Sequence, residues 1–406
     1  MSAPPIRLTH GVLGVAFAAV GSVGSGCGGC RDQNLVPAEI GEEEPFTDDW
    51  GQWMSMTALP DGRPAISYYN RTRGGLSLAC GSFGDDGAVT WEHDEIDGFT
   101  NDEGLDVGDR GLYTSLAIAP DGHIWVAYRD NTLSTLRVAN RSADTAEWTT
   151  NMAEAGGGAS PSVGMFASLA LNASSQPVIA HYDEGKGQLR VVRGDGTTFT
   201  GEVVDEGEDR AADTASGTEA EDADVGMFAR LRIVSGVEYI AYYDAANGQL
   251  KLAWGGTGNY TVEVVDDGVV ADGSTLPASD DVGQWPDLMV VDGKVYIAYQ
   301  DVQNQDLRYA TGTPGRWDIE VVDSGDYVGA DTALFLSGTS PAIAYFDGRN
   351  NDIKLAWRSG DTWQSDTVAG STAALGFHNE VLTTNGHTYT ACYDYTNRSL
   401  WFSALN

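Results

Sequence analysis

Histidines and carboxylates are the side chains of this sequence that could carry out catalysis. A histidine base such as His181 or His378, paired with a tyrosine acid, could act on the C5 proton of a sugar in a lyase reaction. Two carboxylates at a defined separation could instead hydrolyse a glycosidic bond, and Asp287, Asp331 and Glu380 are the candidates. The tyrosine candidates are Tyr182, Tyr243 and Tyr393. Neither set is specific, because aspartate and tyrosine are common throughout the chain.

Other catalytic and metal-binding motifs are missing from the sequence. It contains no recognisable Ser-His-Asp arrangement, P-loop or His-Glu-x-x-His motif. One Cys-x-x-Cys pair, Cys27 and Cys30, has no second Cys or His pair near it, so we do not expect a zinc site. We expect no required cofactor, and the metal content is left open.

A sequence repeat must position these residues. A glycine, an aromatic residue and a small residue begin each copy, followed by Ala-Tyr-Tyr-Asp, Leu-x-apolar-Ala and Val-Val-Asp patterns. The clearest copy predicts four strands within residues 228–265. The leading glycines of the seven copies are Gly51, Gly111, Gly164, Gly226, Gly283, Gly329 and Gly376.

Seven four-stranded repeats of this length predict an all-β fold, a seven-bladed β-propeller of antiparallel sheets. The seventh copy ends at Asn406 with three strands only. We therefore predict that the segment from Leu35 to Gly41 supplies its fourth strand and closes the ring, which removes exposed sheet edges. The predicted propeller covers residues 35–406.

This pattern resembles the tandem-repeat β-propellers of exported bacterial proteins and lipoproteins. The resemblance covers residues 35–406 and concerns the architecture, so it implies no ligand. Sialidase-like propellers usually carry a Ser-x-Asp-x-Gly-x-Thr-Trp box, and none is found here.

Departures from the repeat indicate a candidate site. The aromatic position of the first strand becomes Asp331 and His378 in the last two copies. The small position, serine in the first three copies, becomes Arg230, Asp287 and Glu380 in three later ones. The first strand of a blade is innermost, so we expect these side chains near the axis, together with Trp285. One hypothesis is a ligand-binding pocket, and the other is a buried ion pair between Arg230 and Asp287.

Aspartates recur at two places in the repeat. One ends the second strand of six copies, where it either caps the following turn or binds Ca²⁺; these residues are Asp130, Asp183, Asp244, Asp301, Asp347 and Asp394. Others precede the first strand: Asp49, Asp109, Asp224 and Asp281. Alternating strand directions place both sets on one face, which we expect to be negative.

The N-terminal residues 1–26 resemble the signal peptide of a bacterial lipoprotein, followed by a linker over residues 27–34. Lipidation at Cys27 is the first prediction, and ordinary signal-peptidase cleavage is the alternative. We accordingly expect an outer-membrane or cell-surface lipoprotein, or alternatively a secreted or periplasmic protein. Cys80 and Cys392 either form a disulfide or remain buried thiols.

The charge of the chain restricts its partners. With 59 acidic and 23 basic residues, its formal net charge is −36. Nucleic acids and anionic lipid surfaces need Lys and Arg to neutralise their phosphates, so both are excluded as partners.

The sequence leaves three functions open. The first is a monomeric surface scaffold that binds a glycan, a peptide or a protein through Arg230, Trp285, Asp287, Asp331, His378 and Glu380. The second is a carbohydrate-active enzyme, either a polysaccharide lyase or a glycosidase. The third is a calcium-stabilised structural module of the cell envelope.

Overall fold

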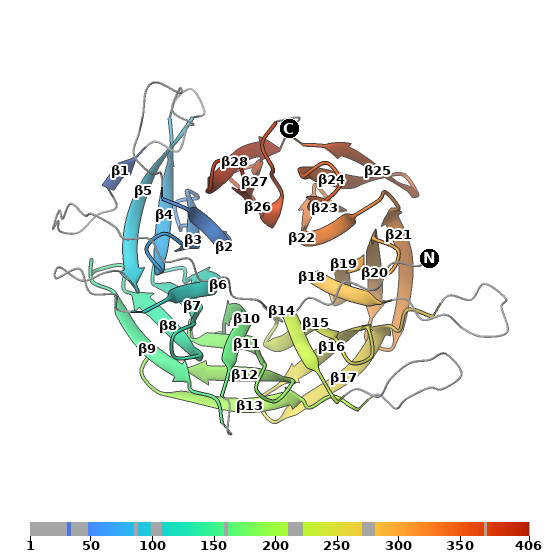
Figure 1. The fold of residues 1–406 in the computed structure, drawn as a ribbon, viewed down its shortest axis with the longest axis horizontal. Helices are drawn as coiled ribbons and strands as arrows, with labels where there is room; N and C mark the ends of the chain where they lie inside the picture. The colour runs from blue at the N-terminus through green and yellow to red at the C-terminus, as the bar shows by residue number, and fades with distance from the viewer. Residues whose placement is uncertain are drawn as a thin grey trace, which may run out of the picture.

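The chain folds into a β-propeller of seven antiparallel sheets around one axis (Figure 1), as the repeat predicts. A computed structural model describes residues 31–33, 48–84, 88–98, 108–157, 161–209, 222–269, 281–368 and 372–405. Among these residues, none forms a helix that is long and apolar enough to cross a membrane. The predicted signal peptide, with Cys27, and the predicted closing strand at residues 35–41 lie outside the described residues.

Each sheet is a blade whose first strand is innermost and whose strands follow in chain order. Blade 1 has β2 (Trp50–Ala58), β3 (Pro64–Asn70), β4 (Gly75–Phe83) and β5 (Val89–Asp97); blade 2 has β6 (Arg110–Ile118), β7 (Ile124–Asp130), β8 (Thr135–Arg141) and β9 (Thr149–Glu154); blade 3 has β10 (Val163–Leu171), β11 (Pro177–Asp183), β12 (Gln188–Gly194) and β13 (Phe199–Asp205); blade 4 has β14 (Val225–Val234), β15 (Val237–Asp244), β16 (Gln249–Gly256) and β17 (Asn259–Asp266). Blade 5 has β18 (Val282–Val291), β19 (Lys294–Asp301), β20 (Asp306–Thr313) and β21 (Arg316–Asp323); blade 6 has β22 (Val328–Ser337), β23 (Ser340–Asp347), β24 (Asp352–Ser359) and β25 (Thr362–Thr367); blade 7 has β26 (Phe377–Thr384), β27 (His387–Asp394) and β28 (Ser399–Leu405).

The two ends of the described chain meet between blades 7 and 1. The Trp50 amide donates to the Arg398 carbonyl at 3.1 Å, and the Tyr393 hydroxyl donates to Asp49 at 2.7 Å. Met54 and Met56 of blade 1 share a buried cluster with Tyr393 of blade 7. Among the described residues, these contacts join blades 7 and 1 and close the ring. Within the predicted linker, β1 (Arg31–Gln33) pairs with β5 at the outer edge of blade 1.

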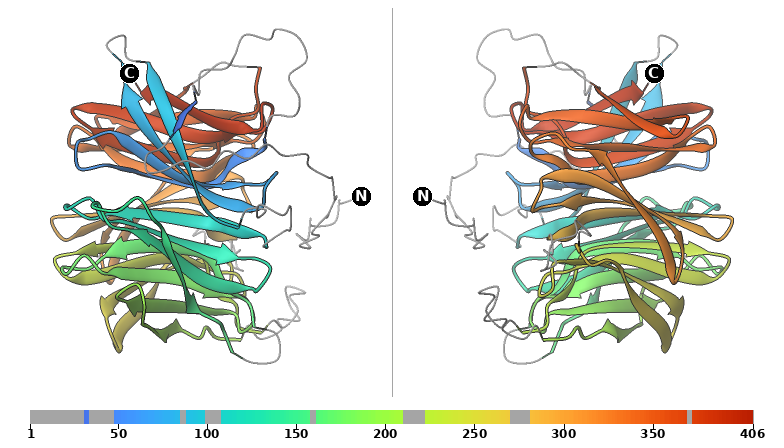
Figure 2. Two further views of the ribbon diagram at one scale, coloured as in Figure 1. Left: turned by 90° about the vertical axis from the view of Figure 1, so that its left-hand side faces the viewer. Right: turned by 90° about the vertical axis from the view of Figure 1, so that its right-hand side faces the viewer.

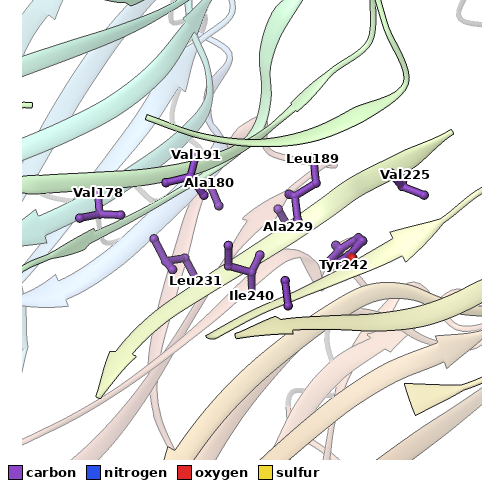
Figure 3. Packing of buried hydrophobic residues seen from close by; sticks show 10 residues of the cluster. Val178, Ala180, Leu189, Val191, Val225, Ala229, Leu231, Ile240 and Tyr242 are labelled. Atoms are coloured by element: carbon purple, nitrogen blue, oxygen red, sulfur yellow. The ribbon is translucent and has the colours of Figure 1, made fainter. Parts of the chain in front are cut away.

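The hydrophobic core consists of layers between neighbouring blades. Between blades 3 and 4, Leu189 and Val191 pack against Leu231, Ile240 and Tyr242, and all five are inaccessible to solvent (Figure 3). Strands buried on both faces explain the nearly continuous apolar runs of the repeat. The two side views in Figure 2 show the blades stacked one on the next around the ring.

The glycine that begins each copy permits close packing between blades. Gly226 has φ +108°, and a Cβ atom there would lie 2.8 Å from the Cα of Leu189 in the preceding blade. A larger residue would therefore clash with the neighbouring backbone and also strain its own. The recurring glycine thus has a structural role.

Candidate functional site

A ring of side chains surrounds the axis at one position of each innermost strand. In blades 1 to 6 this position is the fourth residue of the innermost strand, and in blade 7 it is the second. The backbone there has a positive φ and interrupts the strand register. The φ values of the seven residues lie between 48° and 56°, although none is glycine. They are Trp53, Tyr113, Phe166, Phe228, Trp285, Asp331 and His378. Because all seven blades share this strained conformation, it belongs to the fold and directs these side chains inward.

The aromatic rings contact one another around most of this circle. Centroids are 4.1 Å apart for Trp53 and Tyr113, and 4.3 Å apart for Phe228 and Trp285. The His378 ring packs on Trp53 at 4.5 Å, and its Nδ1 lies 3.8 Å from an Asp331 carboxylate oxygen. The circle is therefore aromatic over five blades and polar in blades 6 and 7, as the departures from the repeat predict.

A second circle, two residues further along the innermost strands, links neighbouring blades by hydrogen bonds. Ser115 Oγ accepts the Leu169 amide at 2.8 Å, and Ser168 Oγ accepts the Leu231 amide at 2.9 Å. Asp287 accepts the Leu334 amide at 2.7 Å, so it does for blades 5 and 6 what serine does elsewhere. Glu380 is likewise held by a backbone hydrogen bond from Met56. We call Ser115, Ser168, Asp287 and Glu380 the serine belt.

Arg230 occupies the serine-belt position of blade 4 and has no such bond. The hypothesis that Arg230 pairs with Asp287 is wrong. Asp287 Oδ1 instead accepts Arg232 at 2.8 Å and the Leu288 amide at 2.8 Å. Arg232 stands two residues further along the same strand and reaches the carboxylate that the belt holds in place. Within the described part of the chain, no hydrogen bond or ion pair engages the Arg230 guanidinium.

Two cavities lie along the axis, and Arg230 and Glu380 line both. The first has a volume of about 70 Å³ and is lined by the aromatic circle, Asp331 and His378. The second has a volume of about 190 Å³ and is lined by Ser55, Ser115, Ser168, Arg232, Asp287 and Asn379. Both are smaller than the several hundred Å³ of typical small-molecule pockets, so they suit one end of a larger ligand.

Burial shifts the protonation of the axial groups. It raises the pKa of Asp331 to about 7 and that of Glu380 to about 7, although the Arg230 charge opposes both shifts. Burial, with a smaller effect of Arg230, lowers the pKa of His378 to about 4. Near neutral pH, His378 is therefore uncharged, while both carboxyl groups are partly protonated and can donate as well as accept hydrogen bonds.

The recurring aspartates have structural roles in the described structure. At the ends of the second strands, Asp244 Oδ1 accepts the Asn247 amide at 3.0 Å, and Asp394 Oδ1 accepts the Asn397 amide at 2.9 Å. These bonds confirm the turn-capping prediction. Among the described residues, no group of three or more His, Cys, Asp or Glu side chains could hold a metal ion. Calcium binding remains a prediction.

The aspartates before the first strands accept hydrogen bonds from tyrosines of the preceding blade. Tyr182 donates to Asp224 at 2.6 Å, and Tyr243 donates to Asp281 at 2.7 Å. The backbone carbonyls of Asp224 and Asp281 accept amides of the second turn of their blades, which places both features on one face as predicted. Parts of the acidic connections, residues 210–221 and 270–280, lie outside the described residues.

The lyase pairs considered from the sequence do not come together in the axial cavities. His181 is fully buried, and its Nε2 lies 2.8 Å from Glu154 of the preceding blade. Tyr182, Tyr243 and Tyr393 are engaged by aspartates between blades. Of the six predicted ligand-binding residues, the first cavity collects Arg230, Trp285, Asp331, His378 and Glu380, and the second adds Asp287.

Sequence reasoning missed two parts of the site and left one question about cysteines open. Arg232 was not singled out, although its spacing from Arg230 places both on the same side of a strand. Tyr113, whose pKa burial raises to about 12, is the tyrosine that lines the first cavity. Cys80 and Cys392 are both buried and form no disulfide, so the disulfide alternative is wrong.

Comparisons with known proteins identify the architecture. No protein-family model matches the sequence, and no curated protein matches it significantly. The polysaccharide lyase Uly1 has a TM-score of 0.51 at 12% identity, covering 92% of this chain and 94% of the lyase.

Two other solved structures are similar at lower TM-scores. The fucose-specific lectin from Aleuria aurantia has a TM-score of 0.44 at 16% identity, covering 72% of this chain and 90% of the lectin. The intramolecular trans-sialidase from Ruminococcus gnavus has a TM-score of 0.44 at 11% identity, covering 88% of this chain and 94% of the enzyme. At 12% identity, the similarity to the lyase shows a shared fold.

Proposed function

We propose that this propeller binds the end of a neutral glycan chain in its axial cavity. The observation that carries the proposal is the Arg230 guanidinium, which lines both cavities without a protein partner in the described structure. Arg230 is half-buried, and a charge partly withdrawn from water is normally paired, so an unpaired one at the wall of a cavity is available to a ligand. Its planar set of donors can bind two neighbouring hydroxyl groups of a sugar.

The surroundings of Arg230 suit a sugar better than an anion. Asp331, Glu380 and His378 supply acceptors and exchangeable donors for hydroxyl groups, and Trp285 and Phe228 supply apolar faces for C–H groups. The carboxyl groups and the net charge of −36 oppose a polyanionic ligand. The small cavity volume indicates that the terminal group enters and that the rest of the chain stays outside.

Calorimetric titration with neutral cello-, manno- and galacto-oligosaccharides tests this proposal. We expect one series to bind the wild type and Arg230→Gln to weaken that binding at least tenfold, since a hydrogen bond to a charged group contributes about 1.5–3 kcal/mol. Arg349→Gln is the matched control, because it removes the same charge from an exposed pair with Asp326. Absence of binding, or equal binding by Arg230→Gln and wild type, would refute the proposal.

A carbohydrate-active enzyme is the second candidate, favoured by the raised pKa values of Asp331 and Glu380 in one cavity. Against it, Glu380 and Asp287 hold backbone amides of neighbouring blades, which restricts them as an acid–base pair. Chromatography of the same oligosaccharides after incubation distinguishes the two functions. Shortened or unsaturated products that disappear with Asp331→Asn would favour the enzyme, and unchanged sugars would favour binding alone.

We also propose that the chain is exported and anchored through a lipid on Cys27. The support is the apolar N-terminal segment that ends in small residues before this cysteine. Labelling of expressing bacteria with radioactive palmitate should mark the wild type and not Cys27→Ala. Equal labelling of both proteins would exclude this anchor.

A further inference from the structure

Blade 6 lacks the hydrogen bond that joins other blades near the axial cavity. In blades 1, 3, 4 and 7, the last tyrosine of the second strand donates to the aspartate that precedes the next blade, as Tyr69 does to Asp109 at 2.6 Å. In blades 2 and 5, Arg129 and Gln300 stand at this position and donate to backbone carbonyls of the next blade. The tyrosine position in blade 6 is Phe346, which has no hydroxyl group, and the aspartate position before this blade is Tyr327. Neither position therefore keeps the residue type that makes this hydrogen bond in blades 1, 3, 4 and 7.

An aromatic cluster occupies this place. The ring centroids of Phe346 and Phe377 are 4.5 Å apart, and those of Phe377 and Tyr395 are 5.8 Å apart. The carbonyl of Tyr327 accepts the Gly348 amide at 2.7 Å, which holds this residue beside the second turn of blade 6. We call Tyr327, Phe346, Phe377 and Tyr395 the aromatic patch.

The outer members of the aromatic patch are exposed. Tyr327 is 59% exposed and Tyr395 is 64% exposed, although both are large and mostly apolar. Within the described part of the chain, only these two aromatic residues are among the large exposed hydrophobic side chains. Their concentration over two adjacent blades distinguishes this sector from the rest of the face.

The patch adjoins, along the chain, a residue that lines the axial cavity. Phe377 directly precedes His378, which lines the cavity and packs on Trp53. Asp331 and His378, the two polar members of the axial circle, belong to the same two blades as the patch (Figure 1). Two independent departures from the repeat, one at the axis and one on the face, thus coincide in blades 6 and 7.

We propose that the aromatic patch binds the sugars that follow the terminal one in a linear neutral oligosaccharide. The inference rests on the proposed function, because the terminal sugar would be held at Arg230. A chain whose end enters a cavity of about 70 Å³ must continue outside it, and Phe377, which is next to the cavity residue His378 in the chain, contacts Tyr395. Aromatic faces pack against the C–H faces of sugar rings, and the Tyr327 and Tyr395 hydroxyls can bond sugar hydroxyls.

Titration with one oligosaccharide series, of one to six cello-, manno- or galacto-units, tests the patch separately from the cavity. Wild-type affinity should rise from the monosaccharide to the trisaccharide. Tyr395→Ala and Tyr327→Ala should each weaken trisaccharide binding about tenfold, the effect of one lost aromatic contact, while monosaccharide binding changes less than twofold. Tyr395→Phe should retain most of the affinity.

The control is Leu133→Ala, which removes a 56% exposed side chain from the equivalent turn of blade 2 on the same face. It should leave all affinities unchanged. Binding that depends on Arg230 but not on chain length, or that survives Tyr395→Ala and Tyr327→Ala, would overturn the role of the patch and leave the axial site intact. Failure of every series to bind the wild type would overturn both.

Discussion

Replacing Asp287 tests whether the serine belt stabilises the propeller. This side chain is 6% exposed and accepts the Leu288 and Leu334 amides as well as Arg232. Asp287→Ala leaves two buried amides without an acceptor, which costs about 1–3 kcal/mol for each amide. We therefore expect the free energy of unfolding to fall by about 2–6 kcal/mol. Loss of the bond to Arg232 adds less than about 1 kcal/mol, because the Arg232 side chain is 43% exposed.

Two further variants separate the amides. Asp287→Ser should recover about half of the loss, since its hydroxyl can accept the Leu334 amide as Ser168 accepts that of Leu231. Ser115→Ala leaves the Leu169 amide alone unsatisfied and should cost about 1–3 kcal/mol. Equilibrium urea unfolding, followed by tryptophan fluorescence, measures all three. If Asp287→Ala and Ser115→Ala both stay within about 0.5 kcal/mol of wild type, the belt does not stabilise the fold.

Two other predictions concern Glu380 and the thiols. Burial raises the pKa of Glu380 from 4.5 to about 7, so the folded protein binds more protons than the unfolded chain between these pH values. Urea unfolding at a series of pH values should therefore show the stability of the wild type falling relative to that of Glu380→Gln as the pH rises from about 4.5 to about 7. A constant or rising stability difference would contradict the raised pKa. Cys80 and Cys392 are buried, and burial raises the pKa of Cys392 to about 12. Both cysteines should react with a thiol reagent in urea and resist it in the native protein. A fast reaction of the native protein would show that the cysteines are accessible.

The sequence predicted the number of blades, the strands of each copy and the shared face of two sets of connections. These features follow from apolar periodicity and turn residues, which are local. For the clearest copy, the predicted strands within residues 228–265 correspond to β14 to β17, which extend from Val225 to Asp266. The collection of the six candidate residues at the axis followed from their places in the repeat.

Contacts between blades were harder to predict. Tyrosines and aspartates recur separately along the chain, and only the folded ring shows that Tyr243 donates to Asp281 of the next blade. The expected pair of Arg230 with Asp287 failed because the choice of partner depends on side-chain reach between two adjacent blades, and Arg232 makes that contact. The aromatic patch was missed because its members lie far apart in the sequence and each replaces a different repeat position.

A crystal structure of the protein with a bound neutral oligosaccharide tests the central claim most directly. The account predicts a terminal sugar whose hydroxyl groups lie within hydrogen-bonding distance of the Arg230 guanidinium, inside the aromatic circle. A sugar bound on the outer strands of a blade, with the axial cavity filled by water, would contradict it.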